Sequence, residues 1–203
     1  HKNKIVTTRR CKTVIQKKSW SDGRVRCYWA NPKNEKYIQY HDMEWGVPTH
    51  DDATLFEMLM LETFQAGLSW ECILNKRDNF RRAFDNFDLR AVCNYDDKKI
   101  SELMQDDGII RNRRKIVATV NNARVFAKII DEFGTFDKYL WQWTDGKIIY
   151  EYDKTQSELS DKISNDLRRR GMRFVGTTTI YAFLQATGVI NSHLPECFCH
   201  IKQ

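Results

Sequence analysis

The sequence predicts an all-α fold, and three features of the chain support that prediction. Between residues 51 and 187, apolar side chains recur at helical spacing and almost never alternate as they do in half-buried strands. The links between these segments are short, and the chain contains no repeat and no low-complexity segment. A length of 203 residues, of which 41% are hydrophobic, suits one domain with a core that needs no disulfide bonds.

The first predicted helix is expected to be central and buried. Asp51 or Asp52 can cap it, because a side-chain oxygen accepts a hydrogen bond from a free backbone N–H in the first turn. The residues that follow, up to Phe64, are apolar on nearly every side, and Gly67 ends the helix. The helices expected next run from Ser69 to Phe84, over 88–94 and over 97–105, the last opened by Asp96 or Asp97.

The second half of the chain continues the helical pattern. Its longest helix is expected from Arg113 to Phe133, because Ile116, Val120 and later apolar residues share one face, and Gly134 then stops it. The remaining predicted elements are a helix over 136–143, a short strand over 148–152, a helix from Ser157 to Arg170 that Gly171 ends, and a last helix over 177–187.

The composition limits the classes of protein and partner. The net charge of +6 and the pI of about 9.0 favour an acidic partner such as nucleic acid, although many soluble proteins are mildly basic. Residues 1–24 are polar and basic without periodicity, so we expect an extension there and a folded domain over 25–203. With no membrane-length apolar run, no secretion leader and six cysteines, we expect an intracellular, cytoplasmic monomer with reduced thiols.

The segment over 167–187 has the features of a helix-hairpin-helix. Gly176 allows the backbone to approach a ligand closely, and the helix that starts at Thr177 and Thr178 presents free N–H groups. Arg173 adds positive charge beside them, so a DNA phosphate is the natural anion for this place. An ordinary corner between two helices with a solvated basic face is the alternative.

A carboxylate and several aromatic residues suggest a binding pocket. Glu62 lies on an apolar stripe of the central helix, where a carboxylate is costly unless it is paired or used. Flat cationic ligands bind aromatic faces, and the candidates for such a cage are Trp29, Tyr37, Tyr40, Trp45 and Trp70. The alternatives are a structural carboxylate, paired with an arginine or bonded to a helix end, and ordinary aromatic core packing.

Two cysteines and two histidines could form a metal site that joins the ends of the domain. Cys27 and His41 lie near its start, while His193 and Cys197 lie near its end in a His-x₃-Cys spacing. Such a set satisfies tetrahedral zinc, with Cys199 and His200 as rival ligands. The alternative is a group of buried thiols without metal.

Four ordered motifs resemble a known family. They are Tyr-His-Asp-x-Glu-Trp-Gly-Val-Pro at 40–48, Gln-Ala-Gly-Leu-Ser-Trp at 65–70, Asp-Gly-Ile-Ile-Arg at 107–111 and Phe-Val-Gly-Thr-Thr at 174–178. From about residue 26 to residue 199 the chain resembles the DNA-3-methyladenine glycosylase I family, within the helix-hairpin-helix glycosylase superfamily. The resemblance implies a base pocket lined by Glu62, Tyr37, Tyr40, Trp45 and Trp70. It also implies one zinc ion held by Cys27, His41, His193 and Cys197. It also makes Leu68 the candidate to fill the gap in the duplex.

The resemblance implies base-excision repair of alkylated DNA, with free 3-methyladenine as the product. Methylation makes the base cationic and an activated leaving group, so the enzyme needs less acid catalysis once the base is flipped out. Glu62, the candidate catalytic residue, can accept a hydrogen bond from the exocyclic amine. No Asp lies between Gly176 and Gln203 and no Lys between Gly176 and Ile201, so we expect a monofunctional glycosylase that uses water. The alternatives are a zinc-stapled DNA-binding module without activity and a glycosylase for another lesion.

Overall fold

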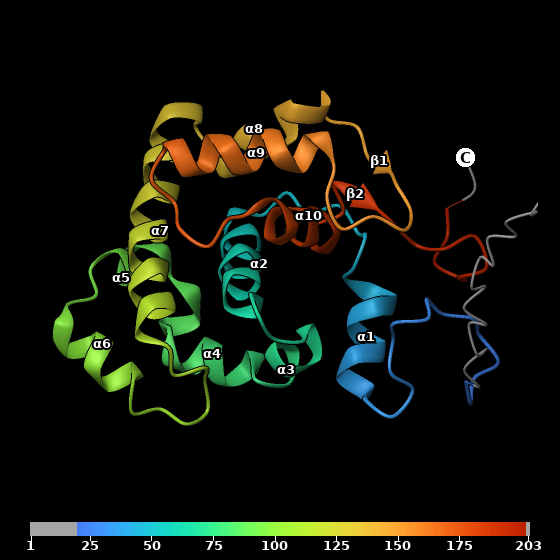
Figure 1. Ribbon diagram of the computed structural model, residues 1–203, viewed down its shortest axis with the longest axis horizontal. Helices are drawn as coiled ribbons and strands as arrows, with labels where there is room; N and C mark the ends of the chain where they lie inside the picture. The colour runs from blue at the N-terminus through green and yellow to red at the C-terminus, as the bar shows by residue number, and fades with distance from the viewer. Residues whose placement is uncertain (1–19, 202–203) are drawn as a thin grey trace, which may run out of the picture.

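The computed structural model describes residues 20–201, so residues 1–19 of the predicted extension lie outside the described residues. Within that range the chain is mainly helical, as the sequence predicts (Figure 1). The helices are α1 (Glu35–Met43), α2 (Asp52–Gln65), α3 (Trp70–Asn75), α4 (Arg77–Ala83), α5 (Leu89–Cys93), α6 (Asp97–Leu103), α7 (Arg113–Phe133), α8 (Phe136–Trp141), α9 (Glu158–Arg169) and α10 (Thr177–Ala186).

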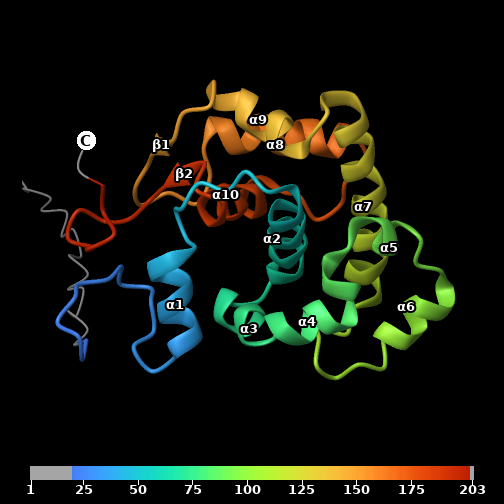
Figure 2. The same ribbon diagram turned by 180° about the vertical axis from the view of Figure 1, so that it is seen from behind.

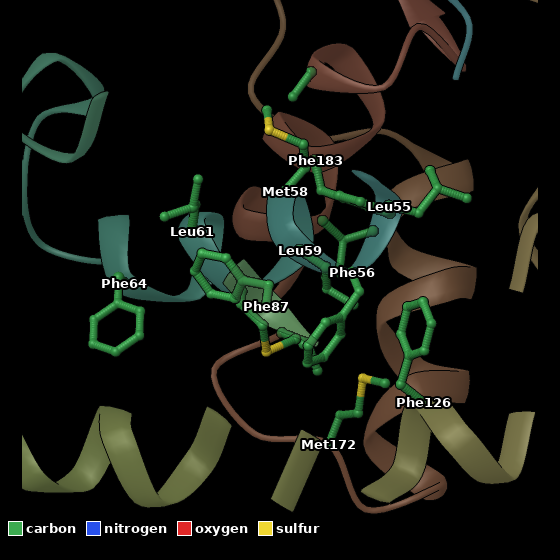
Figure 3. Packing of buried hydrophobic residues seen from close by; sticks show 14 of the residues in the cluster. Leu55, Phe56, Met58, Leu59, Leu61, Phe64, Phe87, Phe126, Met172 and Phe183 are labelled. Carbon is green, nitrogen blue, oxygen red and sulfur yellow. The ribbon is translucent and has the colours of Figure 1, made fainter. Parts of the chain in front are cut away.

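Helix α2 forms the centre of the core, as expected from its apolar sequence. Asp51 caps it by accepting a hydrogen bond from the Thr54 backbone N–H, and every residue from Met58 to Phe64 is buried. Figures 1 and 2 show α2 between α7 on one side and α1 on the other. Phe56 lies edge-on to Phe126 of α7, with ring centroids 5.1 Å apart (Figure 3). Of the three acidic residues of α2, only Glu62 lies within this buried stretch.

Helix α7 also agrees with its prediction. The Asn112 side chain accepts a hydrogen bond from the Lys115 backbone N–H at its start, and Gly134, with φ +86°, ends it. A left-handed residue at that position costs glycine little, so the chain can turn at once into α8. Phe126 stacks on Phe136 of α8 with ring centroids 3.9 Å apart, which fixes the two helices to each other.

Two parts of the helical prediction are wrong. The expected single helix from Ser69 to Phe84 is divided into α3 and α4 at Lys76, whose ammonium donates to the backbone carbonyls of Asp107 and Gly108. That contact is tertiary and leaves no mark on the local pattern. Helix α1 was not expected at all; its sequence signal is Asn34, which caps it by accepting from the Tyr37 backbone N–H.

A two-stranded parallel sheet lies beside the C-terminal half of the helical fold. Strand β1 (Ile149–Tyr150) falls inside the predicted segment over 148–152, whereas β2 (Ile190–Asn191) was not predicted. The partner of β1 lies about forty residues away in the chain, so only the folded topology reveals the pairing. Gly188 turns the chain from α10 into β2 with φ +70°.

Gly188→Ala is expected to destabilise the protein by about 3 kcal/mol or more, because a Cβ there would lie 2.2–2.5 Å from backbone atoms of Val47 and Pro48. Gly146→Ala is the matched control, since Gly146 has nearly the same φ but open space around a Cβ. We expect that control to lose only about 1 kcal/mol, the cost of the left-handed backbone. Thermal unfolding of both variants measures the difference, and equal losses would contradict the close approach at Gly188.

The two ends of the described chain lie on the same side of the molecule, next to α1 (Figures 1 and 2). A hydrogen bond of 2.8 Å from the Phe198 backbone N–H to the Val25 carbonyl joins them. This contact brings the segment before α1 and the segment after β2 together. Within residues 20–201, the helices are too short or too polar to cross a membrane.

Candidate active site

A cavity of about 370 Å³ lies between α1, α2, α3, α10 and the segments that precede α9 and follow β2. Its size is typical of a site for a small organic molecule. The lining residues are Tyr28, Trp29, Tyr37, Tyr40, Trp45, Glu62, Gln65, Trp70, Asp153, Lys154, Thr155, Ala182, Gln185, Ser192 and Leu194. Most of the aromatic side chains come from the first third of the chain, and most of the polar ones come from the last third.

Aromatic rings form one part of the cavity wall. Tyr40 of α1 and Trp70 of α3 lie with ring centroids 5.2 Å apart and planes tilted by 47°. Trp29 contacts both Tyr37, at 5.3 Å between centroids, and Trp45, at 4.7 Å. Faces of this kind attract a flat cation through the ring quadrupole. The cluster can therefore hold a planar, positively charged ring.

Glu62 supplies the carboxyl group of the cavity. It lies on the last turns of α2 and is 3% exposed, and its Oε2 atom has no hydrogen-bond partner among the described residues. No arginine, lysine or histidine in residues 20–201 lies within ion-pair distance of it, so it is not the arginine-paired structural carboxylate considered as an alternative. Burial raises the pKa of Glu62 to about 8. The empty cavity therefore favours the neutral carboxyl.

Burial in the same cavity also raises the pKa values of two tyrosine side chains. Desolvation raises the pKa of Tyr37 to about 12, with smaller contributions from the charges of Glu71 and Glu62, and burial raises the pKa of Tyr40 as well. Both phenols stay protonated at neutral pH. The Nε1 atom of Trp70 is buried and has no partner among the described residues. An unused acceptor on Glu62 and an unused donor on Trp70 in one cavity indicate a polar ligand.

A second cluster joins the two ends of the domain. The side chains of Cys27, His41, His193 and Cys197 are all buried, and one donor atom from each lies within 4.8 Å of the others. The Cys197 Sγ atom lies 3.5 Å from both His41 Nε2 and His193 Nδ1, and the Cys27 Sγ atom lies 3.6 Å from His193 Nδ1. These residues could hold a metal ion. The rival His200 is not in the group, and Cys199 belongs to an alternative group with His41 and Asp42.

Hydrogen bonds to the outer ring nitrogens orient both histidines toward the cluster. His41 Nδ1 lies 2.8 Å from the Asp42 carboxylate, and His193 Nε2 lies 2.9 Å from the Trp45 carbonyl. Arg26 in turn holds Asp42 through contacts of 2.8 and 2.6 Å. Hydrogen bonds from neighbouring thiols, that of Cys199 first, hold the pKa of Cys197 well below its ordinary value, which favours the thiolate. Oriented imidazoles and a thiolate are the usual form of metal ligands.

Comparisons with known proteins give the family. A family model described as methyladenine glycosylase matches residues 29–200. The chain is 41% identical over 181 residues to DNA-3-methyladenine glycosylase 1 of Escherichia coli (strain K12), a match that covers 86% of this chain and 96% of that protein. The chain belongs to the methyladenine glycosylase family.

Solved structures of this methyladenine glycosylase family have the same fold. A crystal structure of 3-methyladenine DNA glycosylase I superimposes with a TM-score of 0.82 at 40% identity, covering 87% of this chain and 100% of the other. A variant of 3-methyladenine DNA glycosylase I in complex with 3-methyladenine superimposes with a TM-score of 0.81 at 35% identity, covering 84% and 95%.

The structure brings most of the predicted pocket residues together. Trp29, Tyr37, Tyr40, Trp45, Glu62 and Trp70 all line the cavity. Leu68 does not; it is 41% exposed on the turn between α2 and α3, directly after Gly67, whose φ is +82°. This turn joins two elements that contribute lining residues. A side chain on this turn can extend outward from the protein surface without disturbing the cavity.

The predicted phosphate-binding residues lie on the connection between α9 and α10 and in the first turn of α10. Gly176 precedes the first turn of α10 without a side-chain cap, and Thr177 Oγ1 lies 2.8 Å from Ser160 Oγ of α9. Asn122 of α7 holds the Arg173 backbone through bonds of 2.8 and 2.9 Å. Thr178 is exposed beside them. The connection is thus fixed to α7 and α9, with its outer face exposed.

Sequence reasoning missed the wall formed by the last third of the chain. Lys154, Gln185 and Ser192 line the cavity, and Gln185 Nε2 donates to Ser192 Oγ over 2.8 Å. None of these residues carries a local pattern that predicts this position. Gln65 also lines the cavity, and here a signal existed, because it opens the motif over 65–70 and lies one helical turn after Glu62.

Proposed function

We propose that this chain is a monofunctional DNA glycosylase that hydrolyses the N-glycosidic bond of 3-methyladenine in alkylated DNA. Membership of the methyladenine glycosylase family gives the reaction class, and one related structure holds 3-methyladenine. The observation that carries the proposal is the unpartnered, buried carboxyl of Glu62 in a cavity walled by aromatic rings. A cationic, planar base with an exocyclic amine complements both features.

Recognition starts after the base leaves the duplex, because the glycosidic bond is inaccessible within the stack. Tyr40 and Trp70, which contact each other, form one wall of the cavity against which the flipped cationic ring packs. Glu62 accepts a hydrogen bond from the exocyclic amine, and the positive charge of the ring favours its carboxylate form over the neutral form of the empty cavity. Neutral adenine lacks that charge and leaves Glu62 protonated, so the cavity discriminates against it.

Hydrolysis then needs little acid catalysis. The methylated base leaves as a neutral molecule when the bond from its ring nitrogen to the sugar carbon breaks, taking the bonding electron pair. Water adds to that carbon and loses a proton. Charge complementarity in the cavity stabilises the bound cation as well as the transition state, so only part of it accelerates the reaction. No lysine lies between Gly176 and Ile201, and the ammonium of Lys154 at the cavity is paired with Glu151 at 3.1 Å. Water is therefore the nucleophile in this proposal, and the product is an abasic site in an uncut strand.

The connection between α9 and α10 serves as a helix-hairpin-helix in this proposal. Backbone N–H groups at Gly176, Thr177 and Thr178 and the side chain of Arg173 bind phosphates of duplex DNA. Leu68, exposed on its turn, fills the space that the flipped base leaves in the stack. The protein acts as a monomer.

The cluster of Cys27, His41, His193 and Cys197 fits one structural zinc ion. Tetrahedral zinc with bonds of about 2.3 Å to sulfur and about 2.0–2.1 Å to nitrogen places sulfur and nitrogen ligands about 3.5 Å apart. The sulfur-to-nitrogen distances of 3.5 and 3.6 Å agree with that geometry. All four positions are occupied by protein atoms, so the ion would link the chain ends and bind no substrate.

The proposal is tested by release of free base from methylated duplex DNA. We expect the protein to release 3-methyladenine while undamaged DNA stays intact, and to leave abasic sites that are cut only after alkali treatment. Chromatography of the released bases and gel analysis of the strands give these results. A folded protein that binds DNA without releasing base would support the non-catalytic module instead. Release of another base alone would support a different lesion.

A further inference from the structure

A second, larger hollow of about 1100 Å³ lies away from the base cavity, between α6, α7 and the α9–α10 connection. We call it the arginine groove. Its lining includes Arg113, Arg114, Arg124, Arg168 and Arg173, all exposed, against two acidic residues, Asp96 and Asp97. Few residues of the base cavity are charged, whereas this groove carries an excess of fixed positive charge. An anionic ligand complements it.

Most of the opposing charge in the groove is already engaged. Asp97 lies 3.3 Å from Arg113, and the Asp96 side chain caps α6 by accepting from the Lys99 backbone N–H. Among residues 20–201, Arg114, Arg168 and Arg173 have no carboxylate within ion-pair distance. By contrast, Arg169 and Arg170, which lie outside the groove, are both paired with carboxylates.

Arg169 and Arg170 follow Arg168 directly but do not line the groove. Arg169 pairs with Asp166 at 3.0 Å, and Arg170 pairs with Glu132 at 2.6 Å. Four arginines of the groove, Arg114, Arg124, Arg168 and Arg173, thus face one hollow without a carboxylate partner among residues 20–201. The other unpaired arginines of that range, Arg24, Arg82, Arg90 and Arg111, do not line it. That concentration indicates a ligand with phosphate or carboxylate groups.

The groove is too long for one phosphate. Arg114 and Arg124 are ten residues apart on α7, which corresponds to about 15 Å along a helix axis. Successive phosphates of one DNA strand are spaced by about 3.4 Å along the duplex axis, so a strand presents several over that length. The groove floor includes Val117, which is 42% exposed and can contact sugar rings. A mononucleotide cannot reach both arginines, whereas a strand can.

Two structural links connect the groove to the base cavity. Gly176, the N-cap of α10, lines the groove, while Ala182 of α10 lines the cavity about 9 Å further along the helix axis. Lys115 follows Arg114, and its buried ammonium donates to the carbonyls of Phe64 and Ala66, both at 2.6 Å. The first turn of α7 therefore fixes the end of α2 that carries Glu62 and leads to Leu68.

We propose that the arginine groove holds the phosphate backbone of duplex DNA beside the flipped nucleotide, with Arg114 of α7 and Arg168 of α9 as phosphate ligands. This inference rests on the proposed function, and it adds phosphate contacts on α7 and α9 to those of the α9–α10 connection. Figure 1 shows the connection running past α7 toward α10, so a strand in the groove leads toward the base cavity. The groove then orients the damaged strand, while the first turn of α10 binds a phosphate and Leu68 on the α2–α3 turn fills the space that the flipped base leaves.

The test compares two double variants with equal charge change. Arg114→Gln with Arg168→Gln removes two groove arginines; Lys128→Gln with Arg169→Gln removes two exposed charges on the same helices outside the groove. Binding of a fluorescein-labelled undamaged duplex is measured by anisotropy over a range of salt concentrations. We expect the groove variant to bind roughly tenfold more weakly for each arginine, with a log–log salt slope shallower by roughly 1.8. The control variant should bind like the parent.

Binding of free 3-methyladenine separates the groove from the cavity. Tryptophan fluorescence titration should give the same affinity for the groove variant and the parent, because no groove arginine lines the base cavity. An unchanged salt slope in the groove variant, or equal losses in both double variants, would overturn the proposal. A parent that binds duplex DNA through the groove but releases no base would leave this inference in place and overturn the proposed function alone.

Discussion

Replacing Glu62 with glutamine is expected to lower the rate of 3-methyladenine release from methylated duplex DNA about 100-fold or more. Glutamine keeps the size of the side chain and one acceptor oxygen, so the cavity keeps its shape. The variant loses the negative charge that complements the cationic ring, and losing one preorganised electrostatic contact costs about 10²–10³ in rate. Single-turnover release of base with enzyme in excess measures the effect on the bond-breaking step.

The pH dependence gives an independent check on the same side chain. The folded-state pKa of Glu62 is about 8, above its ordinary value of 4.5, because burial disfavours the carboxylate. The stability linked to its protonated form is fully present below about pH 4.5 and is lost as the pH rises through 8. The glutamine side chain of the Glu62→Gln variant does not titrate. The melting temperature of this variant, relative to the parent, should therefore rise from about pH 5 to about pH 9.

Glu102→Gln on the exposed face of α6 is the matched control for the loss of one negative charge. It should release 3-methyladenine at the rate of the parent. Release of base at the parental rate by folded Glu62→Gln would remove Glu62 from the mechanism. If the difference in melting temperature between Glu62→Gln and the parent did not change with pH, the carboxylate would be solvated in the folded protein.

The central helices could be predicted because their signals are local. Asp51 and Asn112 cap α2 and α7 within three residues of the N–H groups they accept from, and the apolar spacing between caps and stops is regular. The break at Lys76 could not be predicted in the same way, because its cause is a contact with carbonyls some thirty residues away. The parallel pairing of β1 with β2 is non-local for the same reason.

The residues of the site also divide into those with a local sequence signal and those placed by non-local contacts. Glu62 was found because a carboxylate on an apolar stripe is anomalous in the sequence itself, and the nearby aromatic residues follow from their density. Helix α1, which carries Tyr37 and Tyr40, was missed as a helix even though its residues were chosen correctly for their chemistry. Lys154 and Ser192 line the cavity only because the segments before α9 and after β2 fold back toward α1, and no short-range pattern in the sequence contains that information.

Cys197→Ser is expected to remove the zinc ion and to lower the melting temperature by about 10 °C or more. The cluster links the segment before α1 to the segment after β2, and a structural zinc site contributes its binding free energy to folding. A shift of about 2–4 °C for each kcal/mol is typical of a chain of this size. Elemental analysis after exhaustive dialysis should give about one zinc per parent chain and far less in the variant. Cys72→Ser is the control, because Cys72 is a free cysteine outside the cluster.

The zinc variant should also bind free 3-methyladenine more weakly, although no ligand of the cluster lines the cavity. His193 lies edge-on to Trp45 with centroids 4.7 Å apart, and His41 lies 5.1 Å from Trp29, so the two histidines support two of the aromatic walls. When the metal no longer fixes the imidazoles, both tryptophans lose that support and the cavity binds a flat ring less well. Parental base affinity in a zinc-free, folded Cys197→Ser protein would show that the aromatic wall is held without the cluster. Metal content well below one per parent chain would instead favour buried thiols without metal.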